Sequence, residues 1–600
     1  MLAILAVVVS VPAVFSGWGP MDDLRHRAKL IDPSRVPDKF RQIGLVPEDS
    51  GELTTVLSEM HTINRTRSDF DRLRDYGIMH WWTQQDYRAS NWRPVDSFTH
   101  WLDYRLWPDA PALQHIHNIV WFVAIIMLVA LLYRRLIGPG WVAGLAAMMY
   151  VLDDSNYLPT LWLANRCLLV SLVFALLCVL LHHKWRSSGS IGAAIASGVF
   201  LVLSLLASEA GVSTFAYLFA YALILEQGSL VKRGLSLLPA FAIILIWRAV
   251  YSTLGHGAFG SGFVIDPGRE PVSFMIELLQ RGPVLLFAQL GGPPSEIYSF
   301  IRQSYRPYVV AAAYSFLLLV VIVVWPVVRH NRTARFWLLA MVLAVVPICA
   351  TLPMNRNLLF VAVAAFALIC QFIGAWSAKE SWLPRSRWWG KLAKALAVYF
   401  IIAHIIFAAL GRIASPITVA ETREQFAATM DVGPLPGVED QDLVIVNAPN
   451  PFSLFFMPLY RWHNDQPLPE HVRVLAPGFA LMSVTRTAED TLRVEAASAN
   501  LFTGRQERPF HVVYMYETFN EGFRHSSFPM QAGDVVQLPR MTATVRDVDE
   551  AGLPVTVEFR FAVPLDDASL RWLKWDWHDK QYVPFEVPGL GESVRVKGRF

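Results

Sequence analysis

Charge is scarce in this 600-residue chain, because only 17% of its residues are charged whereas 54% are hydrophobic. The mean hydropathy of +0.36 is higher than a soluble core of this length requires. The net charge of +3 at pH 7 is near neutral, and the basic residues form short clusters between apolar runs instead of one stripe. This pattern excludes a nucleic-acid-binding protein and predicts an integral membrane protein.

Cysteine is nearly absent, with four residues in the chain. Cys167, Cys178, Cys349 and Cys370 all lie within apolar segments. Their spacing matches neither a disulfide framework nor a zinc site, so we interpret them as small buried hydrophobic residues. Internal repeats and low-complexity tracts are also absent from the sequence, which argues against a solenoid or a disordered scaffold.

Long apolar runs are the main feature that is present. A transmembrane helix needs roughly 20 apolar residues, and the six strongest candidates are 114–133, 159–181, 235–254, 308–328, 358–376 and 395–412. Weaker candidates are 1–17, 138–152, 190–206, 212–226 and 336–352. The first run lacks a basic flank and a clear cleavage site, which favours a retained span over a cleaved signal peptide. We expect a mainly α-helical polytopic bundle of about 11 spans.

Lys and Arg clusters predict the orientation, because short cytoplasmic loops retain positive charge. These clusters lie at 134–135, 182–186, 232–233, 329–335 and 379–394. Alternation places 18–113, 153–157, 255–307, 354–357 and everything after about 415 outside. The run 272–290 contains Glu277 and Arg281, which suit a re-entrant or interfacial helix better than a span. The chain is therefore expected to be a multi-pass inner (plasma) membrane protein.

A change of pattern near residue 416 predicts two domains. Residues 1–415 form the membrane domain, with a first outer loop at 18–113 and a second at 255–307. From about 420 the hydropathy drops, and short alternating runs such as DLVIVNA, TLRVEAA, FHVVYMY and VTVEFRFAV are separated by Pro, Gly and Asp. We expect 416–600 to be a soluble extracytoplasmic β-rich domain, of either the α+β or the β-sandwich type.

Two adjacent carboxylates, Asp22 and Asp23, directly follow the first apolar run. An ionisable group so close to a span is costly unless it has a role, although a solvated acidic loop is the alternative. A sugar carried on a polyprenyl phosphate already has a good leaving group, so its transfer requires a base for the acceptor hydroxyl and positive charge for the phosphate. One Asp of this pair is our candidate for the catalytic base.

Arginines near the outer span ends are candidates for phosphate recognition, because a guanidinium stays charged and binds phosphate with two parallel hydrogen bonds. The candidates are Arg93, Arg166, Arg248 and Arg356. The alternative for each is an arginine that extends towards the lipid headgroups. Glu209, Asp153 and Asp154 are candidates for orienting sugar hydroxyls.

The stretch NWRPVDSFTHWLDYRLWPDAPALQHIHN resembles a segment of the GT-C membrane glycosyltransferases, in particular the protein O-mannosyltransferase-like branch. The matching positions over roughly residues 1–375 are Arg93, Pro94, His115, Asn118, Arg166, Glu209 and Arg356. The resemblance implies a first-loop acidic base, carried over onto Asp22 or Asp23, and a polyprenyl-phosphate-sugar donor. The short outer loop at 153–157 departs from that branch by reading LDDSNYLP, and the β-rich domain replaces its repeat tail.

Metal, partners and rival functions complete the sequence predictions. We commit to no metal: His115 and His117 lack a third ligand, although the acidic pairs could hold Mg or Mn. The expected partners are a lipid-linked sugar donor, a glycan, lipid or protein acceptor, and membrane lipids, with no nucleic acid.

Two alternatives to the enzyme hypothesis remain: a transporter or flippase of lipid-linked sugars, and a non-catalytic envelope scaffold. The enzyme hypothesis requires Asp22 or Asp23, Arg93, Arg166, Glu209 and Arg356 to converge in one cavity at the outer end.

Overall fold

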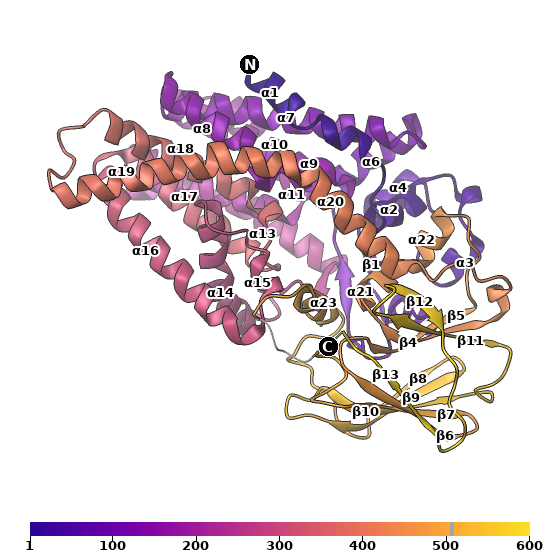
Figure 1. Ribbon diagram of the computed structural model, residues 1–600. Helices are drawn as coiled ribbons and strands as arrows, with labels where there is room; N and C mark the ends of the chain where they lie inside the picture. Colours follow the sequence, from indigo (N-terminus) through magenta and orange to yellow (C-terminus); the bar gives the residue numbers. More distant parts are fainter. Residues whose placement is uncertain (505–508, 600) are drawn as a thin grey trace.

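The computed structural model describes residues 1–504 and 509–599, and it consists of a helical bundle and a β-rich region. The helix α20 (Ala408–Met430) leaves the bundle and ends at the β-rich region, at the lower right of Figure 1. Among the described residues, six helices are long and apolar enough to cross a membrane. They overlap the six strongest sequence candidates, and the predicted total of about 11 spans is not established.

The candidate spans have well-defined bounds. They are α7 (Pro111–Leu136), Leu163–Ser188 with α10 (Arg166–Ser188), α13 (Leu230–Thr253), Gln303–His330 with α16 (Arg306–His330), Asn355–Ser377 with α18 (Leu359–Ser377), and Arg387–Met430 with α19 (Arg387–Ile401) and α20. The weaker candidates fold as shorter helices. These are α1 (Leu2–Val8), α8 (Trp141–Leu152), α11 (Ile191–Ala207), α12 (Thr214–Ala220) and α17 (Arg332–Ile348).

Burial differs widely among the candidate spans. In the span that contains α18, 89% is buried, whereas only 17% of the α13 span is buried. α18 therefore lies at the centre of the bundle, and α13 lies at its periphery. The predicted cytoplasmic loops meet at one end, where Arg186 pairs with Glu226 and Arg332 bonds to the Glu226 carbonyl.

The second outer loop contains α14 (Pro271–Gln289) and α15 (Ile297–Phe300). α14 is not among the candidate spans, in line with its Glu277–Arg281 ion pair. A short strand of this loop, β3 (Gly257–Phe259), pairs with β2 (Arg88–Ser90), which in turn pairs with β1 (Thr62–Asn64). This small antiparallel sheet fastens the second outer loop onto the first.

Two sheets form the β-rich region. One has the order β13-β6-β7-β10-β9-β8, in which all neighbours are antiparallel, and the other has the order β12-β11-β4-β5, in which β4 is parallel to both neighbours. The strands are β4 (Asp442–Ala448), β5 (His471–Pro477), β6 (Met482–Ala488), β7 (Thr491–Ala496), β8 (Val535–Leu538), β9 (Met541–Val548), β10 (Pro554–Phe561), β11 (Leu570–Asp576), β12 (Gln581–Pro584) and β13 (Ser593–Val596).

The strand prediction from alternating sequence holds for several runs and fails for one. β6 and β9 alternate buried and less buried residues, as a sheet with one covered face requires. The run FHVVYMY, in contrast, belongs to the helix α23 (Val512–Asn520). A few alternating residues cannot distinguish a strand from a helix, and here packing against α15 favours the helix.

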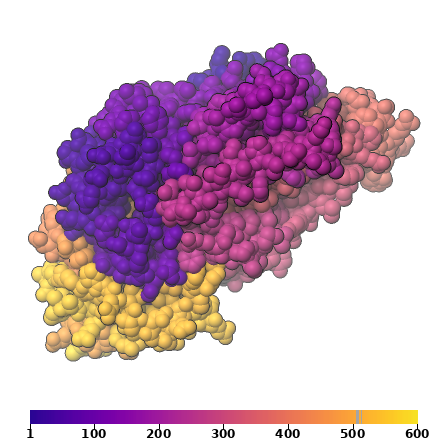
Figure 2. Space-filling model, turned by 180° about the vertical axis from the view of Figure 1, so that it is seen from behind, coloured from indigo at the N-terminus to yellow at the C-terminus, as the bar shows by residue number. Residues whose placement is uncertain are grey.

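The first outer loop and the β-rich region share one hydrophobic core. Its buried residues include Leu24 and Phe40 from the loop, Met430 at the end of α20, and Ile445 and Phe559 from the strands. Three helices of the loop contribute to this core: α2 (Asp22–Leu30), α3 (Asp38–Gln42) and α5 (Arg67–Tyr76). The other two, α4 (Leu53–Glu59) and α6 (Pro94–Leu106), contribute to a smaller separate cluster. Figure 2 shows the indigo and purple loop directly against the yellow C-terminal region. The β-rich region therefore supports the loop that carries Asp22 and Asp23.

Candidate active site

Asp22 is the first residue of α2, and it is the one residue of this helix that is not buried. Residues 23–30 are buried although most of them are polar or charged. α2 packs between α6 and α22 (Met457–His463), so the first outer loop and the β-rich region enclose it from two sides. The helix therefore holds a single accessible carboxylate at its N-terminus, where the helix dipole stabilises negative charge.

The neighbouring Asp23 has a different environment. Its carboxylate accepts hydrogen bonds from the backbone N–H groups of Gly19 at 2.7 Å and Ala164 at 2.8 Å. Burial raises the pKa of Asp23 to about 6, against the opposing effect of Arg423 and these two hydrogen bonds. Both oxygens are thus engaged in joining the segment before α2 to the start of the 163–188 span. Of the two candidate bases, only Asp22 remains accessible.

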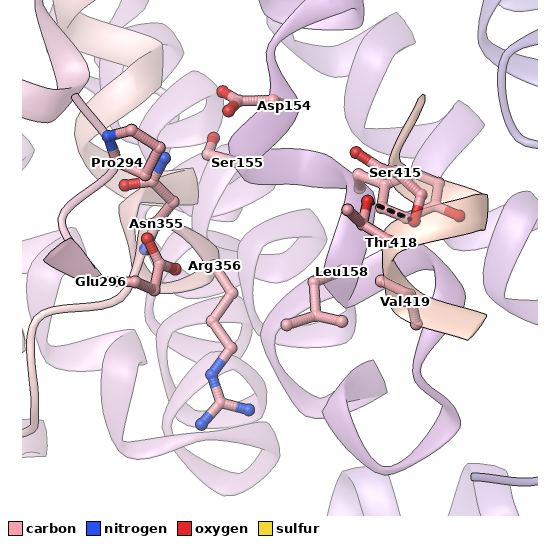
Figure 3. A pocket seen from close by; sticks show the side chains of 11 residues that line it. Asp154, Ser155, Leu158, Pro294, Glu296, Asn355, Arg356, Ser415, Thr418 and Val419 are labelled. Atoms are coloured by element: carbon pink, nitrogen blue, oxygen red, sulfur yellow. Dashed lines mark hydrogen bonds between the residues drawn. The ribbon is translucent and has the colours of Figure 1, made fainter. Parts of the chain in front are cut away.

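Arg356 extends into a cavity of about 180 Å³ at the outer end of the bundle. Its guanidinium carbon lies 4.8 Å from the centre of the Trp162 ring. Within residues 1–504 and 509–599 no carboxylate forms an ion pair with it, and its Nε has no hydrogen-bond partner. Figure 3 shows the side chain between Glu296 on one wall and Leu158 and Val419 on the other. An unpaired guanidinium in a cavity is suited to an anionic ligand.

Two acidic residues also line this cavity. Asp154 belongs to the predicted second acidic pair, and Glu296, which precedes α15, was not predicted. Glu296 accepts a hydrogen bond from the backbone N–H of Asn355 at 2.8 Å, and the Asn355 side chain accepts one from the backbone N–H of Ser295 at 2.9 Å. Burial raises the pKa of Glu296. This reciprocal pair fixes Glu296 beside Arg356.

Asp153 is buried and does not line the cavity, unlike its neighbour Asp154. It accepts hydrogen bonds from the Ser155 hydroxyl at 2.7 Å and from the Gln289 side chain at 3.4 Å. Burial, and next the charge of Asp154, raise its pKa to about 7. Asp153 therefore stabilises the turn between α8 and the segment after it, and Asp154 is the member of the pair that faces the cavity.

Arg93 and Glu209 form a second polar group near the same end of the bundle. Two nitrogens of Arg93 lie 2.7 and 2.8 Å from Oε2 of Glu209, and the Tyr251 hydroxyl donates to Oε1 at 3.2 Å. Both side chains of the ion pair are partly exposed, at 20% and 29%. The sequence predicts that Arg93 binds the phosphate and that Glu209 orients the sugar. In the structure the two side chains form one charge-neutral ion pair.

Charged residues from four segments of the chain lie near Arg356. Asp22, Glu296 and Arg93 are close enough for their charges to act on its guanidinium. The ion pair with Arg93 adds Glu209 to this region, and Nη1 of Arg93 also lies 3.5 Å from the Cys167 sulfur. The charged residues of this region come from the first outer loop, from η5 (Glu209–Ser213), from the second outer loop and from η8 (Asn355–Leu358).

Three of the sequence candidates lie outside this region. Arg166 is fully buried and paired with Asp103 at 2.5 Å, so it cannot reach a phosphate in this conformation. Nε2 of His115 lies 2.8 Å from the carbonyl oxygen of Gly17, so His115 holds the segment that precedes α2. Arg248 pairs with Asp266 at 2.7 Å, which neutralises its charge. Each of these positions is explained by structural support.

The donor set for a divalent metal is incomplete. Asp154 and Glu296 present carboxylate oxygens to the cavity, which is the ligand type that Mg and Mn prefer. In the part of the chain that the structure describes, no three His, Cys, Asp or Glu side chains lie close enough to share one ion. We therefore derive no step through a metal.

Comparison with known proteins yields weak structural similarity alone. No family model matches the chain, and no curated protein matches it. Crystal structures of the Archaeoglobus fulgidus oligosaccharyltransferase align at 12% identity with a TM-score of 0.39 in the complex with Zn and sulfate, and at 13% identity with a TM-score of 0.35 in the form tethered to an acceptor peptide. These alignments cover 80% of this chain and 62% and 64% of that enzyme, so this chain spans less than two thirds of its length. Similarity this low assigns no activity.

Proposed function

We propose that this protein is a membrane glycosyltransferase of the GT-C type, which moves a sugar from a polyprenyl-phosphate carrier to an acceptor outside the cytoplasm. The observation that carries the proposal is the presentation of Asp22: a buried helix exposes one carboxylate, and Arg356 with an unpaired guanidinium lies within its electrostatic range. A base beside a phosphate-binding cation is the minimum that this transfer requires.

The donor phosphate is assigned to Arg356. Its guanidinium forms no ion pair with a carboxylate among the described residues, and a phosphate would satisfy its unpaired Nε. The cavity wall includes Leu158 and Val419, and α20 exposes Ile413 and Ile417 to the surroundings. An apolar surface beside a cationic cavity suits a carrier whose headgroup is bound while its chain stays in the bilayer.

The reaction is a single displacement with inversion at the anomeric carbon. The acceptor hydroxyl oxygen attacks the anomeric carbon, and the bond from that carbon to the phosphate oxygen breaks. The electron pair of this bond leaves on the phosphate, whose charge Arg356 stabilises, and Asp22 takes the proton of the hydroxyl. Arg93 with Glu209, Asp154 and Glu296 supply hydrogen-bonding groups for the sugar hydroxyls. No acid is needed because the phosphate is a weakly basic leaving group.

The proposed location is the cell inner membrane, with the site and the β-rich region on the outer side. The support for this orientation is that short loops rich in Lys and Arg are retained in the cytoplasm, and such loops meet at the opposite end of the bundle. The acceptor class comprises an envelope glycan, a lipid or a protein.

Comparison of envelope glycans by mass spectrometry tests this function. A strain without the gene should lack one sugar on one glycan or glycoprotein, and the wild-type gene should restore it. The Asp22→Asn variant should fail to restore it at equal protein levels, whereas Arg27→Met is the control on the same helix. Unchanged envelope glycans in the deletion strain would refute the function, and full restoration by Asp22→Asn would refute the base.

A further inference from the structure

Arg25 lies one helical turn after Asp22 on α2 and forms an ion pair with it. Nη2 of Arg25 is 3.0 Å from Oδ1 of Asp22, and the two side chains are 9% and 27% exposed. The arginine is therefore enclosed by the protein, whereas the carboxylate is partly exposed. Such an arrangement limits the rotamers that the carboxylate can adopt, because one of its oxygens is held from behind.

The other donors of Arg25 have no partner. Nε and Nη1 are buried and make no hydrogen bond to any described residue. The titratable side chains near these two nitrogens carry no negative charge. They are His26, Lys29 and His61, and the positive charge of Arg25 acts on each of them. Within the described chain, Asp22 is the carboxylate that compensates this buried guanidinium.

We propose that Arg25 is a positioning residue for Asp22: its ion pair holds Oδ1 of the carboxylate and so fixes the direction in which Oδ2 is presented to the acceptor hydroxyl. This inference rests on the proposed function, in which Asp22 is the base.

A double-mutant cycle in Arg25→Met, Asp22→Asn and the combined variant tests the inference. Arg25→Met should lower kcat roughly 10- to 100-fold, because a misplaced base reacts poorly, and should leave the KM for the lipid-linked donor within about threefold. Arg25→Lys should restore most of kcat because it keeps the charge. In the Asp22→Asn background, Arg25→Met should cause no further loss. An equal loss in both backgrounds would overturn the inference.

Thermal unfolding of the same variants gives a readout that does not depend on activity. Asp22→Asn should unfold at a lower temperature than the wild type because it leaves Arg25 uncompensated, and the added Arg25→Met change should restore part of the loss. A combined variant less stable than Asp22→Asn would contradict the pairing. If pairing holds but Asp22→Asn retains full turnover, the proposed function fails instead.

Arg27→Met is the matched control for these measurements. Arg27 is on the same helix, is equally enclosed at 9% side-chain exposure, and pairs with Asp109 at 2.8 Å, away from Asp22. Its loss should lower the unfolding temperature but leave kcat of the folded protein within about threefold. A fall in kcat equal to that of Arg25→Met would show a general effect of α2 packing and would overturn the specific role of Arg25.

Discussion

Replacement of Arg166 by methionine should unfold the outer end of the bundle. Nη2 of Arg166 is 2.5 Å from Oδ2 of Asp103, and Nε is 2.5 Å from Oδ1 of Asn118. Loss of the guanidinium leaves Oδ2 of the buried Asp103 without its cation, although Nδ1 of His117 still lies 2.7 Å from Oδ1, so the cost is about 3 kcal/mol, the lower end for breaking a buried pair. The carbonyls of Thr99 and Gln114 also lose a charged donor, at about 1 kcal/mol or more each. The sum of roughly 5 kcal/mol equals the whole stability of many domains.

The assay is thermal unfolding of the purified protein in one detergent, with the yield of monodisperse protein measured in parallel. Arg35→Met is the control, because Arg35 and its partner Asp109 are 45% and 56% exposed, and such a surface pair contributes about 0–1 kcal/mol. Arg166→Met should lose most of its folded yield, and the control should lose little. A stable Arg166→Met protein that cannot transfer sugar would refute the buried-pair reasoning and restore the substrate role.

Three further outcomes follow from the site and the core. Arg356→Gln should raise the KM for the donor roughly 10- to 100-fold, since it removes charged hydrogen bonds worth about 1.5–3 kcal/mol; an unchanged KM in a donor titration would exclude Arg356 from phosphate binding. Burial raises the pKa of Asp23 in the folded protein to about 6, above its value in the unfolded chain. Its contribution to the free energy of unfolding should therefore fall by about 2 kcal/mol as pH rises from 4 to 7, and Asp23→Asn should abolish that dependence in pH-resolved melting curves. Trp82→Ala should lower the free energy of unfolding by about 3–5 kcal/mol, because Trp82 is fully buried in the shared core. Limited proteolysis of this variant should cut the first outer loop and the β-rich region together. Cleavage of one of them alone would contradict a common core.

Apolar length and alternation predicted much of the fold. The six strongest runs correspond to the six helices that can cross a membrane, and DLVIVNA and TLRVEAA correspond to strands β4 and β7. The shared core was missed, because hydropathy reports that Phe40 and Ile445 are apolar but not that they pack together. The helix α23 was missed because seven alternating residues fit both structures.

The candidate site was predictable as a set of charges but not as a set of partners. In the sequence Arg166 and Arg356 are equivalent, since each lies near an outer span end. The difference arises from Asp103, which neutralises Arg166 and lies 63 positions earlier. Glu296 is a lone acidic residue after two prolines, and nothing local to it indicates that Asn355 will hold it beside the cavity. Pairing across long separations depends on tertiary contacts that one sequence does not reveal.

The most direct test of the central claim is sugar transfer by the two aspartate variants. Purified protein in proteoliposomes would receive a labelled polyprenyl-phosphate sugar and an envelope extract as the acceptor pool. Asp22→Asn should bind the donor while transfer falls roughly 10²–10⁴-fold, and Asp23→Asn should keep transfer within about tenfold because Asp23 bonds to the backbone instead of facing the cavity. Transfer at the wild-type rate by Asp22→Asn, or loss with Asp23→Asn alone, would contradict the account.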